Sequence, residues 1–224
     1  YNSTVSELNK LRDKAIETNK KWAKKLHIGE STAITCVKPS GTVSQLVNSA
    51  SGIHPRYNDY YIRRVRNDKK DPLSQTVIDS GVPYSSDPYN GNAWVFDFPM
   101  KAPPKAITRK SLGPLDQLEL WKHFASHYCE HKPSMTCYVG EKDWPEVGAW
   151  VWKNFDIING ISFLPSADEG HIYQLAPYED ISKEKYKELA KTMPKNINWS
   201  SIVEEEDFTT SSQEFACTAD QCEI

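Results

Sequence analysis

The sequence predicts an α/β fold in which helices alternate with the strands of a largely parallel sheet. Short apolar and β-branched runs, each bounded by turn residues, are typical of covered strands. Between these runs, apolar residues recur every three or four positions, as they do along one face of a helix. A chain of 224 residues with 38% hydrophobic residues is long enough to bury a core. Because strands and helices alternate, we expect parallel pairing.

The N-terminal region is expected to form a helix, a strand and a second, shorter helix. The first helix covers about residues 4–26, where one face carries Leu8, Leu11, Ala15, Trp22, Ala23 and Leu26. The run TAITCV predicts a buried strand over residues 32–37, which Pro39 ends. A short helix is expected over residues 42–47.

The same alternation continues through the rest of the chain. Further strands are expected at residues 60–65, 93–98, 135–139 and 161–164. Further helices are expected near residues 73–79, 115–131 and 144–155. From about residue 200 the sequence becomes acidic and rich in serine and threonine, so we expect a domain over 1–200 and a mobile tail over 201–224.

Composition argues against several classes of protein. The net charge is -3 with 25% charged residues, which gives no overall field for nucleic acid or a membrane. No apolar run approaches the roughly 18 to 20 residues that span a bilayer, and no signal peptide is visible, so we expect a cytoplasmic protein. The five cysteines are an odd number, which argues against a secreted disulfide framework. Since the chain starts at Tyr1, we expect it to be the back part of a longer polypeptide.

The tail carries a cysteine pair, Cys217 and Cys222, in the ending ACTADQCEI. Thiol–disulfide exchange needs two sulfurs that can meet each other and then a partner, and a mobile terminus provides that access. Residues 201–216 can extend to roughly 50 Å at about 3.3 Å per residue. We therefore predict a redox shuttle. The alternatives are a disordered end with incidental cysteines, or half of a metal site, which would need ligands that the tail lacks.

A turn after the first expected strand could hold an anion. In KPSGTVSQLV, residues Ser40, Gly41 and Thr42 combine a flexible backbone, amides at a helix start and hydroxyl donors, and Lys38 adds charge. The stretch lacks the full spacing of a Walker loop. On local features alone, an ordinary helix-capping turn is therefore the simpler interpretation.

Two other clusters have simpler explanations. Zinc would suit the residue types of His127, Cys129, His131 and Cys137, but the first three, at two-residue steps, point to different faces of a helix. We therefore predict packing there and no metal. The basic run within residues 63–70 and its neighbouring tyrosines would suit nucleic acid, but no wider basic surface accompanies them. We predict a solvated face and no nucleic-acid partner.

Three stretches together resemble the C-terminal part of the adenosylcobalamin-dependent (class II) ribonucleotide reductases, close to the ribonucleoside-triphosphate reductases. They are ITCVKPSGTVSQLVNSASGIHPRYNDYYIRRVR over 34–66, CEHKPSMTCYV over 129–139, and the terminal ACTADQCEI. The resemblance covers essentially the whole chain. It implies a ten-stranded α/β barrel of two parallel half-barrels, of which residues 1–200 supply the C-terminal portion and residues 201–224 are a flexible tail.

The resemblance also implies the chemistry. The phosphates of a ribonucleoside triphosphate, or of a diphosphate, would bind to Ser40, Gly41 and Thr42. The resemblance thus favours a phosphate loop over the helix-capping turn that the local features suggest. Cys217 and Cys222 would reduce the disulfide formed in each turnover, and thioredoxin or a similar reductant would then reduce them. Adenosylcobalamin would generate a cysteine thiyl radical that removes the ribose 3′-hydrogen before the 2′-hydroxyl leaves as water.

One departure from the family is important. The thiyl cysteine of the family lies in an Asn-Pro-Cys-Gly-Glu motif, which this sequence lacks. We therefore expect a fragment or split subunit whose partner is the remaining N-terminal part of the reductase. Two alternatives stay open: a non-enzymatic nucleotide-binding or thiol-carrier module, and a glycyl-radical (class III) reductase, whose glycyl loop is not apparent here. His54 is a tempting corrin contact, but a histidine beside a proline is more often structural.

Overall fold

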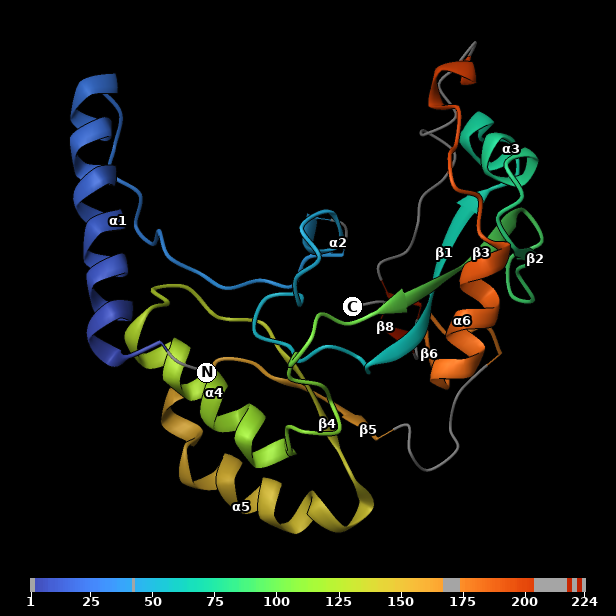
Figure 1. The fold of residues 1–224 in the computed structure, drawn as a ribbon. Coiled ribbons are helices and arrows are strands. Elements are labelled where there is room, and N and C mark those ends of the chain that lie inside the picture. The colour runs from blue at the N-terminus through green and yellow to red at the C-terminus, as the bar shows by residue number, and fades with distance from the viewer. Residues whose placement is uncertain (1–2, 42, 167–173, 204–216, 219–220, 223–224) are drawn as a thin grey trace. The chain divides into compact units, whose positions relative to one another are not determined.

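A computed structural model gives the fold of the chain (Figure 1). It describes residues 3–41, 43–166, 174–203, 217–218 and 221–222. The chain divides into two compact units, one formed by Tyr1–Arg56 with Ile107–Ser166 and the other by Tyr57–Ala106 with Ala167–Glu223. No helix in the described ranges is long and apolar enough to cross a bilayer.

The first unit opens with α1 (Val5–Leu26), which confirms the long helix predicted from the apolar spacing. A capping box fixes its start: Thr4 Oγ1 accepts from the Glu7 amide, and the Glu7 carboxylate accepts from the Thr4 amide. The helix ends at His27, which has φ 54° in the left-handed region. The short helix α2 (Val43–Leu46) follows further along, as predicted.

The core of the first unit is a βαβ motif covered by a further helix. Strands β4 (Thr136–Val139) and β5 (Ser162–Pro165) are parallel, and α5 (Trp144–Lys153) connects them. Helix α4 (Pro114–His127) packs against this motif. Single-turn helices η1 (Glu141–Asp143) and η2 (Phe155–Ile157) flank α5. The buried core residues are Ile53, Leu118, Leu120, Trp121, Met135, Cys137, Val139 and Val147.

The strand predicted over residues 32–37 is not a strand of a sheet. The Thr35 carbonyl accepts from the amides of Glu130 and His131, and the Val37 carbonyl accepts from the Ser134 amide. The partner is thus the loop that follows α4, and a loop cannot provide the regular ladder that a strand requires. The same bonds explain why α4 ends at His127 and does not continue to residue 131.

The second unit contains a four-stranded sheet in the order β2-β3-β1-β6. Its strands are β1 (Tyr60–Asp68), β2 (Tyr84–Ser86), β3 (Ala93–Lys101) and β6 (Tyr178–Asp180). All three pairings are antiparallel, so the prediction of a largely parallel sheet is wrong for this unit. Helix α3 (Pro72–Asp79) leads from β1 to β2, and the chain then turns back so that β3 fills the position between them.

Arginines of β1 are engaged in ion pairs and do not form a solvated face. The Arg64 guanidinium lies 2.9 Å from Asp97 Oδ1 and 2.6 Å from Glu179 Oε2, with its side chain 7% exposed. Burial raises the pKa of Asp97, and the Arg64 charge opposes that shift. Arg66 pairs with Asp87 at 2.8 Å. The prediction of a solvated basic face is therefore wrong for Arg64 and Arg66.

The C-terminal region begins with α6 (Lys183–Thr192) and the short η4 (Trp199–Ser201). Beyond it, the structure describes a small antiparallel pairing of β7 (Cys217–Thr218) with β8 (Gln221–Cys222). Cys217 is directly opposite Cys222 in its backbone register. The mobility predicted for residues 201–224 falls largely on residues outside the described ranges and stays a prediction.

Candidate functional site

The loop after Pro39 is held by hydrogen bonds among serines. The Ser40 amide donates to Ser51 Oγ at 2.7 Å, and Ser40 Oγ accepts from the Ser44 amide at 3.1 Å. The Ser44 hydroxyl donates to the Ser40 carbonyl at 2.6 Å. Ser40 therefore caps the first turn of α2, as the local sequence suggests. In these bonds Ser40 Oγ is only an acceptor, so its own hydrogen can still be donated to a ligand.

Gly41 leaves its side of the backbone open. A Cβ added at Gly41 would meet no described atom within 4 Å, so the fold alone does not require glycine at this position. A glycine that packing does not demand suits a backbone that a ligand approaches closely. Thr42, the third predicted phosphate-binding residue, lies outside the described residues.

Gly52 is a structural glycine that the sequence reasoning missed. Its φ is +59°, and an added Cβ would lie 2.9 Å from the Lys38 carbonyl oxygen. Only glycine accommodates both this backbone conformation and so close an approach. Gly52 thus packs the turn at residues 51–53 tightly against the segment that leads into the candidate loop.

His54 connects that turn to strand β4. Its Nε2 lies 2.9 Å from the Thr136 amide nitrogen, and its Nδ1 lies 2.8 Å from the Ser51 carbonyl oxygen. Because an amide donates and a carbonyl accepts, Nε2 must be unprotonated while Nδ1 carries the hydrogen. Burial lowers the pKa of His54 below its usual value, although the bond to the Ser51 carbonyl opposes the shift. The ring is therefore neutral and structural.

Arg56 is a buried cation near the end of α2. The residue is 5% exposed, and its guanidinium donates to the backbone and side-chain oxygens of Asn48. No carboxylate pairs with it among the residues that the structure describes. Buried charges in proteins are usually paired, so this arrangement favours an anionic ligand nearby. Lys38 adds a second cation, whose Nζ donates to Ser134 Oγ at 2.8 Å.

Cys129 and Cys137 of the first unit pack as the sequence suggests. Cys137 is 0% exposed, and burial raises its pKa to about 12. Burial also raises the pKa of Cys129, to about 11. Cys36 Sγ donates to the Lys132 carbonyl at 3.3 Å and lies 4.0 Å from His131 Nδ1. Cys129 and Cys137 are therefore protonated thiols at neutral pH and poor nucleophiles.

The predicted site residues fall in both units. Ser40 and Gly41 belong to the loop of the first unit, whereas Cys217 and Cys222 belong to the second. The structure brings the two cysteines to opposite positions of the β7–β8 pairing. Each site is thus defined within its own unit.

Comparison with known proteins confirms the resemblance inferred from the sequence, although no family model matches the chain. The chain is 28% identical over 201 residues to the adenosylcobalamin-dependent ribonucleoside-triphosphate reductase of Euglena gracilis, covering 88% of this chain and 27% of that protein. The enzyme of the same name from Lactobacillus leichmannii is 26% identical over 197 residues, covering 86% and 26%.

A solved B-12 dependent (class II) ribonucleotide reductase has the same fold over most of the chain. It superimposes with a TM-score of 0.73 at 26% identity, covering 86% of this chain and 27% of that structure. The chain is thus a mixed helix and sheet structure that matches part of a class II reductase. The curated relatives that it matches are named adenosylcobalamin-dependent ribonucleoside-triphosphate reductases, and the chain spans about a quarter of their length. The described strands form no closed barrel.

Proposed function

We propose that this chain is the C-terminal part of a cytoplasmic class II ribonucleotide reductase, which converts ribonucleoside triphosphates to deoxyribonucleotides. The observation that carries the proposal is the match of 86% of the chain, in sequence and in fold, to class II reductases. In this view residues 1–200 complete a ten-stranded barrel with the remaining N-terminal part of the enzyme. Residues 201–224 act as the redox tail.

The substrate phosphates bind at the loop Ser40, Gly41 and Thr42. Two observations support this assignment: Ser40 Oγ only accepts in its bond to the Ser44 amide, and a Cβ added at Gly41 would meet no described atom within 4 Å. Arg56 supplies a cation that no carboxylate neutralises among the described ion pairs, and Lys38 supplies a second. A triphosphate would provide the negative charge that this arrangement favours.

The terminal cysteines supply the reducing equivalents. Each turnover replaces the ribose 2′-hydroxyl by hydrogen: the hydroxyl leaves as water, and two active-site thiols give two electrons and two protons and become a disulfide. One thiolate of the pair Cys217 and Cys222 attacks that disulfide, and exchange leaves the new disulfide between Cys217 and Cys222. Thioredoxin, or a similar dithiol, then reduces this pair and is itself oxidised.

His54 is not available as a ligand for the cobalamin. His54, the histidine considered for a corrin contact, uses both ring nitrogens in bonds to Thr136 and Ser51. We assign the binding of the cobalamin, and the Asn-Pro-Cys-Gly-Glu cysteine, to the remaining N-terminal part.

The proposal is tested by reconstitution. The chain is combined with the polypeptide from the same source that carries the Asn-Pro-Cys-Gly-Glu motif, together with adenosylcobalamin, thioredoxin, thioredoxin reductase and NADPH. We expect deoxynucleotide from ATP or CTP in amounts exceeding one per enzyme, and less from the corresponding diphosphates. Nucleotide binding without deoxynucleotide formation would instead support a non-enzymatic nucleotide-binding module.

A further inference from the structure

Helix α1 carries an apolar stripe along its whole length. At 100° per residue, the side chains of Leu8, Leu11, Ala15, Trp22 and Leu26 fall within about 60° of the helix circumference. Asn19 lies at the margin of the same stripe, between Ala15 and Trp22. A stripe of this kind is the face that a helix buries against a neighbour.

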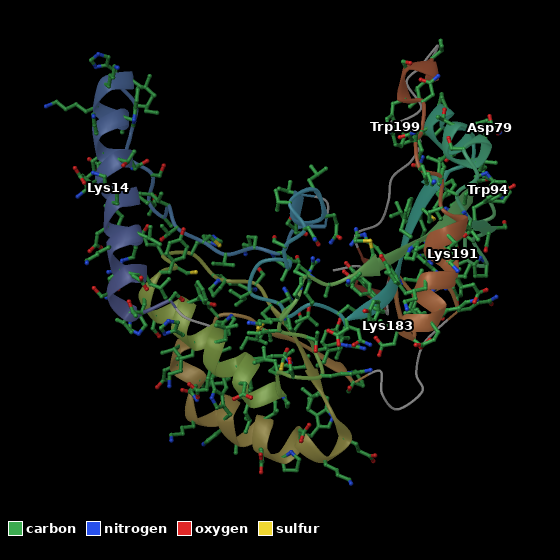
Figure 2. All side chains as sticks on the ribbon, in the orientation of Figure 1. Lys14, Asp79, Trp94, Lys183, Lys191 and Trp199 are labelled. Carbon is green, nitrogen blue, oxygen red and sulfur yellow. The ribbon has the colours of Figure 1, made fainter. Side chains whose placement is uncertain are left out.

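The large side chains of this stripe are buried only at its beginning, although Ala23, beside its far end, is 4% exposed. Leu8 is 3% exposed, near the end of α1 that packs on α4, and His123 of α4 lies 3.0 Å from the Ser3 carbonyl. Leu11 and Leu26 are each 59% exposed, and Trp22 is 46% exposed. In Figure 2, the half of α1 beyond Lys14 projects away from α4. Three large apolar side chains thus face solvent on a well-formed helix.

Lysines flank the exposed end of the stripe on one side and cover the face opposite it. The last two turns contain Lys20, Lys21, Lys24 and Lys25 and no acidic residue. Lys25 Nζ lies 4.6 Å from the centre of the Trp22 ring, so a cation is already in place at the edge of the stripe. A partner that covers Trp22 and Leu26 would therefore be stabilised by acidic groups around an apolar groove.

A second copy of this chain fits the stripe poorly. A parallel pair of α1 helices would bring Lys25, at the edge of the stripe, and the neighbouring Lys21 of both copies close together, which is unfavourable. An antiparallel pair would place the basic end of one copy against the Leu8 end of the other, where α4 already packs.

A membrane surface also fits less well, although basic amphipathic helices can bind one. The stripe is narrow, and Asn19 lies beside its apolar residues, half-buried in the free chain. Its amide needs hydrogen-bond partners, which a protein groove can provide and a layer of acyl chains cannot.

We propose that the exposed part of the stripe, residues Leu11, Trp22 and Leu26, docks into an acid-rimmed apolar groove on the polypeptide that carries the rest of the reductase. This inference rests on the proposed function. The matched relatives are about four times as long as the region they share with this chain, so a large protein surface is available to cover the helix. The stripe continues from the buried Leu8, as expected for a helix shared between two parts of one enzyme.

The test measures binding of the purified chain to the separately expressed polypeptide with the Asn-Pro-Cys-Gly-Glu motif, by titration calorimetry without nucleotide. Trp22→Ser and Leu26→Ser should each weaken binding about tenfold or more, as expected for interface anchors. Lys24→Ser, on the opposite face of α1, should change the affinity less than about threefold. Raising the salt concentration should weaken wild-type binding, because the proposed rim is acidic. Circular dichroism checks that each variant keeps its helix content.

Several results would overturn the docking inference. One is equal binding of the wild type, Trp22→Ser and Leu26→Ser to the polypeptide. If the variants combined with that polypeptide still made deoxynucleotides, the proposed function would stand while the docking inference failed. A wild-type chain that did not bind the polypeptide but sedimented with phosphatidylcholine and phosphatidylglycerol vesicles would identify a membrane site instead. A dimer of the chain alone that Leu26→Ser dissociates would identify a second copy as the partner.

Discussion

The imidazole of His54 accepts a hydrogen bond from the Thr136 amide at 2.9 Å, and this bond exists only while Nε2 is unprotonated. Through its other nitrogen, His54 holds Ser51, whose hydroxyl accepts from the Ser40 amide at 2.7 Å. A chain of three hydrogen bonds thus links strand β4 to the candidate phosphate loop. The state of one buried ring therefore bears on the position of that loop.

This relationship predicts a pH dependence of stability. The folded state lowers the pKa of His54 from its ordinary value of 6.5, so below about pH 6.5 the unfolded chain binds a proton that the folded chain resists. The free energy of unfolding should fall as the pH drops below 6.5, by at most about 1.4 kcal/mol per pH unit from this group. Urea unfolding at a series of pH values measures it.

The matched variants are His54→Gln and His131→Gln. Glutamine at position 54 offers an amide oxygen in place of Nε2 but does not titrate, so it should flatten this part of the pH profile. His131 is exposed, and its replacement should leave the profile largely unchanged. A wild-type profile that His54→Gln does not alter would show that His54 is not the group responsible.

Two glycines of the loop region should respond differently to alanine. Gly41→Ala should change the free energy of unfolding by less than about 0.5 kcal/mol, because the added Cβ meets no described atom within 4 Å. The same Cβ should obstruct a phosphate and weaken nucleotide binding about tenfold or more. Gly52→Ala should destabilise the chain by about 1–3 kcal/mol, since φ is +59° and the Cβ would lie 2.9 Å from a carbonyl oxygen.

Chemical denaturation and calorimetric titration with a ribonucleoside triphosphate separate these effects. If Gly41→Ala binds nucleotide as tightly as the wild type, the turn only caps α2, as its local geometry already allows.

Arg56 should act on the phosphates of the substrate and not on its base. Arg56→Met should weaken the binding of ATP about tenfold or more, by removing a cation from a poorly solvated position. The affinity for adenosine, which has no phosphate, should be unchanged. Arg56→Lys should recover part of the loss, because it restores the charge without the planar fork. Equal losses for ATP and adenosine would indicate a purely structural role at the end of α2.

The sequence predicted those parts of the fold whose apolar periodicity is long or whose connections are simple. Helix α1 follows from the spacing of Leu8 to Leu26, and the β4–α5–β5 motif follows from two short apolar runs around a helix. The antiparallel sheet was missed because β2 has only three residues, too few for a detectable pattern. The run at residues 32–37 resembles a strand in composition, but its hydrogen-bond partner is a loop.

The candidate site likewise contains residues that the sequence indicated and residues that it did not. Ser40 and Gly41 belong to a recognisable motif, so the sequence pointed to them directly. Gly52 and Arg56 follow no periodic pattern: one is needed for a contact with Lys38, and the other is notable only for being buried without a carboxylate. Both properties depend on segments that the chain brings together by folding. The run SGIHPR was the available signal, and glycine and proline in it marked a turn without showing what that turn supports.

The central claim is that the terminal cysteines reduce the active-site disulfide of a class II reductase after each turnover. Cys217→Ser in the reconstituted enzyme tests it most directly. Deoxynucleotide is counted per enzyme, first from pre-reduced protein without thioredoxin and then with thioredoxin, its reductase and NADPH. The account predicts that the variant makes about one deoxynucleotide per active site in the first experiment and gains almost nothing in the second, where the wild type turns over repeatedly. Steady-state turnover of Cys217→Ser at the wild-type rate with thioredoxin would contradict it.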